Sequence, residues 1–192
     1  MCAASEWSAG SPLADLSGEE FAVWAGFWQS HAALARGLDA DLRAAHGLPL
    51  TDFEILLWLA NRPCEGMRMA ALADTVLLSP SGLSRAVERL ETRGLVQRIP
   101  CTEDRRGSYA ALTESGSNLV RTAGATHAAG IRRRFLDRLT SQETLLLTTI
   151  WDRLLVDSQQ TCAWPETQAS GTDEARIGAG AGKTIRTRRH DV

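Results

Sequence analysis

The side chains with the clearest chemistry lie in a short polar run at residues 79–85. Ser81, Ser84 and Arg85 occur there together with Gly82. Serine hydroxyls can bond bases or phosphates, and an arginine can fork onto guanine. Small side chains and a glycine let the backbone come close to a groove. The run therefore indicates a surface that contacts nucleic acid, and these side chains are the candidates for reading bases.

The element that must present this run is a helix beginning at Ser79. Its hydroxyl suits the N-cap, and Pro80 suits the first helical position, where no amide hydrogen is needed. The N-terminal amides also favour phosphate, so we include Ser79 in the candidate surface. Gly94 predicts the end of the helix at a position with positive φ. An apolar stripe follows helical spacing at Leu83, Ala86, Val87 and Leu90.

Taken alone, this segment also fits an ordinary amphipathic helix with a solvated charged face. Its neighbours favour a DNA-binding unit. Residues 68–76 have helical apolar spacing and lead through a short turn into the helix, which gives a helix-turn-helix pair. Residues 95–99 and 109–112 predict two strands. The polar loop between these strands contains Asp104, Arg105, Arg106 and Gly107.

The local charge agrees with a DNA-binding role better than the whole-chain charge does. The chain as a whole carries a net charge of −2, but residues 79–113 contain six arginines and four acidic residues. Such a surface suits salt-sensitive phosphate binding. We assign Arg89 and Arg93 to phosphates.

The predicted fold is mainly α with a small β-wing: a winged helix-turn-helix flanked by long N- and C-terminal dimerisation helices. The helix-turn-helix spans about residues 68–94 and the wing about 95–113, inside a domain at 17–160. The dimerisation helices are expected over about 17–46, where Ser17 and Glu20 form a capping box, and over 113–160. A compact second helix is expected over residues 50–61.

The region 113–160 is expected to hold two helices. Thr113 caps a long one that runs to about Leu139, and Thr140 with Glu143 forms a capping box for the last one. The last helix is more apolar than one packing face requires. A symmetric homodimer would bury that surplus.

The two ends of the chain have little pattern. Residues 1–16 are expected to be a flexible N-terminus, and residues 161–192, rich in Gly, Ala, Thr and Ser, a disordered tail with a basic end. No apolar stretch approaches the roughly 20 residues that a membrane span needs. We therefore expect a cytoplasmic protein without a membrane partner.

The four cysteines show no CxxC spacing and form no plausible zinc pattern with the four histidines. Reduced thiols are the simple interpretation, and Cys101, just before the predicted wing tip, is the candidate for redox sensing. No Ser/His/Asp order, phosphate-binding glycine loop or pair of catalytic carboxylates stands out. We predict neither an enzyme nor a cofactor or metal site.

With these residues in place, the chain resembles the MarR family of bacterial transcriptional regulators from about residue 19 to residue 155. The most specific stretches are Ser-Pro-Ser-Gly-Leu-Ser-Arg at 79–85, Leu-Glu-Thr-Arg-Gly-Leu-Val at 90–96 and Asp-Arg-Arg-Gly at 104–107. The resemblance implies a homodimer that binds a pseudo-palindromic operator in double-stranded DNA. It also implies that Asp104 braces Arg106 in the minor groove, a task that Arg105 could share.

The resemblance further implies a small aromatic or lipophilic effector, bound between the dimer platform and the winged lobe. The candidate lining residues are Trp24, Trp28, His31, Trp58 and His127. The alternative is that this aromatic stripe is simply core. The predicted function is a dimeric repressor released by a small-molecule effector. The alternatives are a redox-sensing regulator that uses a cysteine and a winged-helix protein-interaction module.

Overall fold

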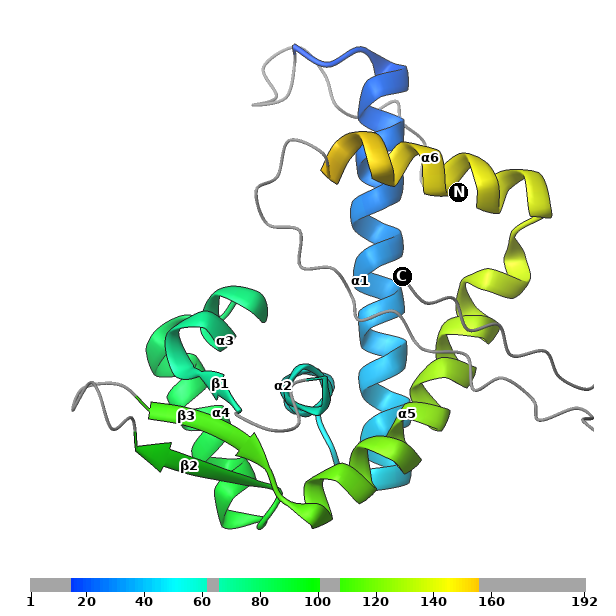
Figure 1. Cartoon of the computed structure of the whole chain (residues 1–192). Helices are drawn as coiled ribbons and strands as arrows, with labels where there is room; N and C mark the ends of the chain where they lie inside the picture. Colours follow the sequence, from blue (N-terminus) through cyan, green and yellow to red (C-terminus); the bar gives the residue numbers. More distant parts are fainter. Residues whose placement is uncertain (1–14, 62–65, 101–107, 156–192) are drawn as a thin grey trace, which may run out of the picture. The chain divides into compact units, whose positions relative to one another are not determined.

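The computed structural model describes residues 15–61, 66–100 and 108–155. This part of the chain is mainly helical with a small antiparallel sheet, as the sequence predicts (Figure 1). Its elements, in chain order, are α1 (Gly18–His46), α2 (Leu50–Ala60), β1 (Met67–Arg68), α3 (Met69–Thr75), α4 (Pro80–Thr92), β2 (Val96–Pro100), β3 (Ser108–Leu112), α5 (Glu114–Arg134), the 3-10 helix η1 (Leu136–Arg138) and α6 (Ser141–Leu155).

The ends of α1 confirm the sequence signals. The Ser17 hydroxyl accepts a hydrogen bond from the Glu20 amide, and the Glu20 carboxylate accepts one from the Ser17 amide. This reciprocal capping box satisfies two amides that have no partner inside the helix. Gly47 ends the helix with φ at 58°, in the left-handed region that glycine adopts without strain.

Helix α4 also begins and ends as predicted. The Ser79 hydroxyl accepts a hydrogen bond from the Gly82 amide at 3.1 Å, and Pro80 is the first helical residue. Gly94, with φ at 68°, turns the chain into β2. The predicted stripe is buried, namely Leu83, Ala86, Val87 and Leu90. One face of α4 is therefore fixed in the core, and the opposite face is left at the surface.

The sheet has the strand order β1-β3-β2, and both pairs are antiparallel. The β2–β3 pair confirms the predicted hairpin and is referred to here as the wing. The sequence placed Arg68 inside the first helix of the helix-turn-helix pair, which was wrong. Arg68 lies in β1, opposite Tyr109 of β3, and α3 begins one residue later. Arg68 adopts the strand conformation because it pairs with β3. A strand of only two residues has no sequence pattern from which it could be predicted.

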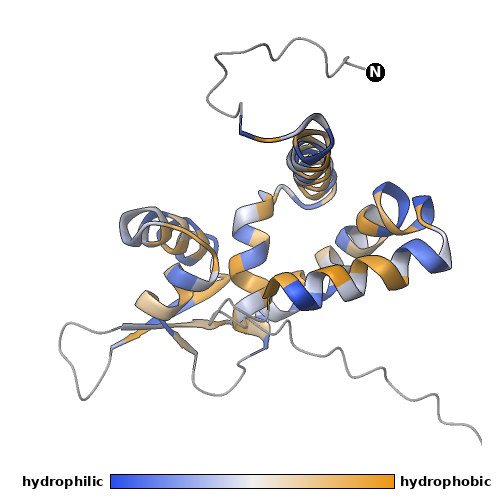
Figure 2. Cartoon of the chain, turned by 90° about the horizontal axis from the view of Figure 1, so that it is seen from above, coloured by the Kyte–Doolittle hydropathy of each residue, from blue (hydrophilic) through white to orange (hydrophobic). Residues whose placement is uncertain are grey.

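Helix α2 lies at the centre of the core. Phe53, Ile55, Leu56 and Leu59 are all buried there, and α2 packs against α1, α4, α5 and β3. In Figure 2, hydrophobic and hydrophilic positions alternate along the helices, as is typical of helices that bury one face. Because α2 touches both the long helices and the helix-turn-helix pair, it determines how the two regions pack.

The turn between α3 and α4 contains an unusual residue. Leu77 has φ at 53°, and it is the one non-glycine residue with positive φ in the described part of the chain. Its side chain is 82% exposed. A left-handed conformation costs an L-residue roughly 1–2 kcal/mol, so the turn is strained at this point.

Helices α1 and α5 cross closely at two glycines. A Cβ atom at Gly130 would lie 2.7 Å from Leu38 Cδ2, and one at Gly37 would clash with the Arg134 side chain. Beside the crossing, Arg134 and Arg133 both pair with Asp41. Arg134 Nη2 donates to Asp41 Oδ1 at 2.8 Å, and Arg133 Nη2 donates to Asp41 Oδ2 at 2.8 Å. These hydrogen bonds, that of Arg134 above all, hold the pKa of Asp41 below its usual value.

The long helix after the wing is shorter than predicted. It was expected to reach about Leu139, but α5 ends at Arg134, because Phe135 leaves the helical region with φ at −128° and ψ at −67°. The predicted capping box at Thr140 and Glu143 is confirmed. The Thr140 amide donates to the Glu143 carboxylate, and the Glu143 amide donates to the Thr140 hydroxyl.

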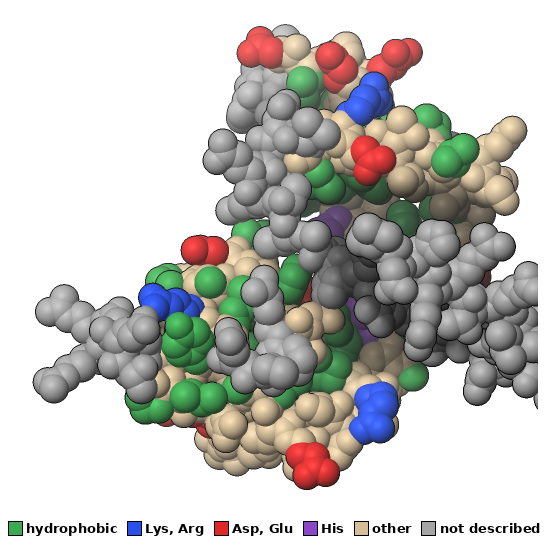
Figure 3. Space-filling model, in the orientation of Figure 1, with side chains coloured by type: hydrophobic (Ala, Val, Ile, Leu, Met, Phe, Trp, Pro, Cys, Tyr) green, Lys and Arg blue, Asp and Glu red, His purple; other side chains and the backbone are tan. Residues whose placement is uncertain are grey.

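Helix α6 buries none of its residues within this chain. It contacts α1 through the rings of Trp151 and Phe27, whose centroids lie 5.9 Å apart. The large apolar side chains exposed on α1 and α6 are Val23, Trp24, Phe27, Trp28, Leu145, Leu146, Trp151, Leu154 and Leu155. We call this set the platform surface. Figure 3 shows hydrophobic side chains among other residues on the visible face of the molecule. None of the described helices has the length and apolar character that a bilayer span requires.

The Asp41 cluster predicts an acid-dependent loss of stability. Because the folded-state pKa of Asp41 lies below its unfolded value of about 3.9, the ion pairs stabilise the fold above that pH. This stabilisation is lost as the pH falls through the folded-state pKa. Denaturant unfolding from pH 7 to pH 3 should show a smaller loss of stability on acidification in Asp41→Asn than in the unmodified chain.

Arg134→Met is the matched variant, because it removes the main cation and keeps the carboxylate. Like Asp41→Asn, it should show a smaller loss of folding stability on acidification than the unmodified chain. If both variants lose stability on acidification as steeply as the unmodified chain, the cluster does not contribute to the pH dependence.

Candidate nucleic-acid interface

The exposed face of α4 carries the side chains that the sequence singled out. Ser81, Ser84 and Arg85 are exposed, and we call these three residues the recognition face. Arg85 Nε donates to the Ser81 carbonyl at 3.3 Å, which directs the guanidinium along the helix toward its N-terminus. Gly82 is half-buried, and its amide bonds the Ser79 cap. The first turns of α4 thus place two hydroxyls and one guanidinium together at the surface.

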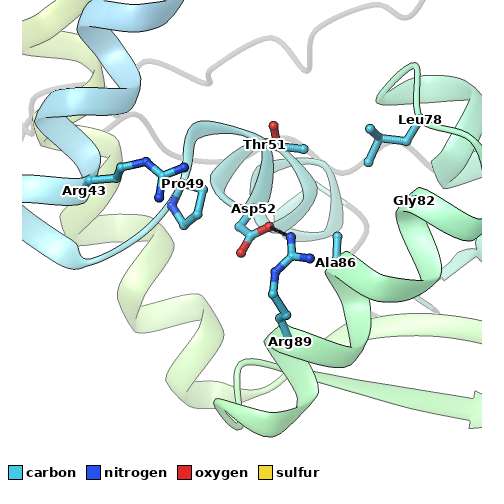
Figure 4. A pocket seen from close by; sticks show the side chains of 8 residues that line it. All are labelled: Arg43, Pro49, Thr51, Asp52, Leu78, Gly82, Ala86 and Arg89. Carbon is cyan, nitrogen blue, oxygen red and sulfur yellow. Dashed lines mark hydrogen bonds and ion pairs between the residues drawn. The ribbon is translucent and has the colours of Figure 1, made fainter.

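Arg89, assigned to phosphates from the sequence, has a partner within the chain. Its Nη2 donates to Asp52 Oδ1 of α2 at 2.7 Å (Figure 4). The Asp52 side chain is 3% exposed, whereas the Arg89 side chain is 55% exposed. The pair therefore joins a buried carboxylate of α2 to a half-exposed guanidinium of α4.

Arg93, also assigned to phosphates, lies at the C-terminal end of α4. Its Nη1 donates to the Gly47 carbonyl at 3.3 Å. That bond ties the end of α4 to the turn between α1 and α2. The side chain is exposed, so the remaining donors of the guanidinium face solvent.

Arg98 of β2 is an arginine whose role the sequence did not indicate. Its Nε pairs with Glu91 Oε2 at 3.0 Å, and its amide donates to Glu91 Oε1 at 3.1 Å. Its Nη2 donates to the Ser84 carbonyl at 3.0 Å. These contacts attach the first strand of the wing to α4. No local pattern could have revealed them, because they depend on how β2 packs beside α4.

The wing loop lies outside the described residues. Asp104, Arg105 and Arg106 all fall in that segment, so their predicted contact with the minor groove stays a prediction. The strand ends that lead into the loop are described, and Pro100 pairs with Ser108. The four cysteines, Cys101 among them, also lie outside the described residues.

An open pocket of about 480 Å³ lies between α2 and α4 (Figure 4). It is lined by Arg43, Pro49, Thr51, Asp52, Leu78, Gly82, Ala86 and Arg89. None of the five predicted effector residues is among these lining residues. Thr51 and Asp52 were missed from the sequence because both lie in the first turn of an otherwise apolar helix.

The effector candidates on α1 are surface side chains in this chain rather than core. Trp24 is 49% exposed and Trp28 is 61% exposed. Their rings stack on each other with centroids 6.0 Å apart, and His31 stacks on Phe27 at 6.4 Å. These rings extend along α1 from the part that α6 contacts through Trp151.

The other two candidates lie closer to the core. His127 of α5 packs against Phe53 with centroids 4.8 Å apart, and Trp58 of α2 is half-buried. Burial lowers the pKa of His127. Its Nδ1 is buried and has no hydrogen-bond partner among the residues that the structure describes.

Comparison with known proteins identifies relatives that share this sequence pattern and this fold. Residues 46–107 match the family model described as MarR family. The structure of AbsC, a MarR family transcriptional regulator from Streptomyces coelicolor, is similar at 35% identity and a TM-score of 0.65. The match covers 72% of this chain and 93% of AbsC.

Two further relatives agree. Sco3205, a MarR family transcriptional regulator from Streptomyces coelicolor solved in complex with DNA, is 33% identical with a TM-score of 0.69, and the match covers 76% of this chain and 91% of Sco3205. The HTH-type transcriptional regulator MhqR of Bacillus subtilis (strain 168) is 28% identical over 115 residues, which are 60% of this chain and 77% of MhqR. The resemblance seen in the sequence is confirmed: this chain belongs to the MarR family and is a winged-helix, DNA-binding transcriptional regulator.

Proposed function

We propose that this chain is a dimeric repressor that binds a pseudo-palindromic operator and that a small-molecule effector releases it. The observation that carries the DNA-reading part is the recognition face. It lies on a helix whose opposite face is buried, so these side chains are presented on a fixed support. In such a helix-turn-helix, the second helix enters the major groove and its N-terminal residues contact bases.

Within this proposal, the three side chains of the recognition face read base edges, and the wing loop reaches the adjacent minor groove. Arg106 enters that groove with Asp104 as its brace, and Arg105 can share the task. Narrow, A·T-rich minor grooves attract arginine through their negative potential. The Ser79 cap and the first amides of α4 face the backbone phosphates.

Arg85→Ala tests base reading. If Arg85 forks onto a base, its loss should weaken binding to the cognate site by about 1–3 kcal/mol and relax specificity there. Fluorescence anisotropy with a fragment selected from genomic DNA and with a random duplex measures both effects. Arg36→Ala is the matched control, because it removes an exposed arginine from α1. Equal losses on both DNAs would make Arg85 a phosphate contact.

Dimerisation is proposed from the platform surface. Large apolar side chains on α1 and α6 stay exposed in the single chain, and α6 buries none of its own residues. An apolar surface of this kind is typical of a protein interface. A second copy related by a two-fold axis would bury it and place two α4 helices about 34–36 Å apart, as successive major grooves require.

Leu154→Glu and Trp28→Glu test the dimer. Each places a charge in the platform surface, so sedimentation equilibrium should show a monomer where the unmodified chain is a dimer. Affinity for an operator with two half-sites should fall to that for a single half-site. Leu77→Glu is the control for the oligomeric state alone, because Leu77 is also an exposed leucine but lies in the turn before α4, away from the platform surface and close to the recognition face. A monomeric unmodified chain, or dimeric variants, would contradict the proposal.

The effector is proposed to be a small aromatic or lipophilic compound. His31 of α1, which is exposed and lies outside the platform surface, and the half-buried Trp58 of α2 supply the ring contacts, and the imidazole of His127 supplies one polar anchor. A ligand releases DNA only by binding more tightly to the arrangement of the lobes that does not fit the operator. The ligand must therefore contact groups between the platform and the winged lobe, where the spacing of the lobes is decided.

Titration with a panel of phenolic compounds tests the effector. An effector should change the tryptophan fluorescence and release the labelled operator over the same concentration range. His127→Phe keeps an aromatic ring against Phe53 but removes the polar anchor, so it should weaken both responses about tenfold, as expected for one lost hydrogen bond in a pocket. No response across a broad panel would leave the rings with a structural role.

A further inference from the structure

Asp52 is the one buried charged or polar side chain in the described part of the chain. It lies in the first turn of α2, where the positive end of the helix dipole favours a carboxylate. A carboxylate removed from water also needs a cation and hydrogen bonds close by. Arg89 of α4 supplies that cation at 2.7 Å. Arg89 is thus held in place by the need of the buried Asp52 carboxylate for a cation, whether or not DNA is bound.

We propose that Asp52 and Arg89 act as a brace that sets the position of α4 on α2, and that both are positioning residues for specific DNA binding. This proposal rests on α4 being the recognition helix. It gives Arg89 a function that its sequence position did not suggest. Arg89 contributes to specificity through Asp52, rather than mainly through a phosphate.

The location of the brace explains why it would affect the reading of bases. Arg89 is one helical turn after Arg85 on the same helix, so the brace holds the segment next to the recognition face. Two other arginines hold α4 near the surface: Arg98 bonds the Ser84 carbonyl and pairs with Glu91, and Arg93 bonds the Gly47 carbonyl. Among the contacts of these three arginines, only the brace involves a buried charged group. It is therefore the contact least able to exchange its partner for water.

Base reading and phosphate binding respond differently to a shift of α4. Hydrogen bonds to base edges need the side chains of the recognition face in one geometry, whereas phosphate contacts position the protein without reading sequence. A small shift of α4 therefore reduces affinity for the cognate site more than affinity for random DNA. Loss of a phosphate contact weakens both by the same factor.

Asp52→Asn and Arg89→Met test the brace, separately and together. Affinities for the cognate fragment and for a random duplex are measured between 50 and 300 mM salt, a span of about sixfold chosen because phosphate contacts are salt-dependent. If the brace acts as proposed, each single variant weakens cognate binding roughly tenfold while random-DNA binding stays within about twofold. The double variant should lose no more affinity for the cognate fragment than either single variant does, because each single variant already removes the same interaction.

The salt dependence separates the two roles of Arg89. If Arg89 were a phosphate contact, Arg89→Met would reduce the slope of log affinity against log salt by about 0.9. It would also weaken binding to the cognate fragment and to random DNA by the same factor. Asp52→Asn would leave DNA binding unchanged or make it stronger, because it frees the Arg89 guanidinium. That set of results would overturn the proposal. An unchanged slope with lost specificity in both variants supports it.

Two matched variants keep the test independent of folding. Arg43→Met removes a cation that lines the same pocket but pairs with Asp39 within α1, so it should leave the specificity ratio unchanged. Arg89→Lys keeps a cation that can donate the single hydrogen bond that Arg89 makes to Asp52. It should therefore retain more stability and more specificity than Arg89→Met, which shows that the loss in Arg89→Met comes from the missing partner of Asp52.

Variants of the recognition face distinguish failure of this proposal from failure of the proposed function. If replacing Ser81, Ser84 and Arg85 together by alanine changes neither the affinity for the cognate fragment nor that for random DNA, α4 is not the recognition helix and the brace has no DNA to position. If Arg85→Ala loses specificity while Asp52→Asn does not, the recognition helix stands and the brace is overturned.

Discussion

The burial of α2 is the constraint on which the other features depend. One face of this helix packs on the long helices α1 and α5, and other residues of it pack on α4 and β3. Its apolar side chains cannot leave this position without exposing a large area to water. Through α2, the position of the helix-turn-helix pair is linked to the helices that carry the platform surface. The charged contacts of α4 refine a position that hydrophobic packing has already determined.

The arginines around α4 divide into two groups. Arg89, Arg93 and Arg98 each bond a group on a different element, whereas Arg85 bonds only a carbonyl of its own helix. Three attachments along one short helix favour movement of α2, α4 and the wing strands as one body. In the dimer proposed above, an effector would therefore change the spacing of the two α4 helices more readily than the shape of either one. The positive charge counted over residues 79–113 therefore exceeds the number of arginines that are available to DNA, because some of these arginines bond groups within the chain.

Local features of the fold could be predicted from the sequence, because each depends on a few neighbouring residues. The Ser17–Glu20 and Thr140–Glu143 capping boxes, the Ser79 cap and the turn at Gly94 are of this kind. Contacts that depend on tertiary packing could not be predicted. The Asp52–Arg89 pair joins positions 37 residues apart, and Arg68 enters a strand only because β3 lies beside it. The end of α5 was missed for a related reason, since the apolar pattern continues beyond Arg134 into η1 and only the backbone at Phe135 breaks the helix.

Leu77 offers a practical consequence of the strained turn before α4. Its backbone is held in a conformation that leucine rarely adopts, while its side chain is 82% exposed. The side chain thus adds little to the core, although its Cα lies two residues from the cap of α4. A cysteine introduced at this position could carry a fluorophore or a spin label close to the N-terminus of α4. Such a reporter would follow the arrival and departure of DNA with the buried stripe of α4 left intact.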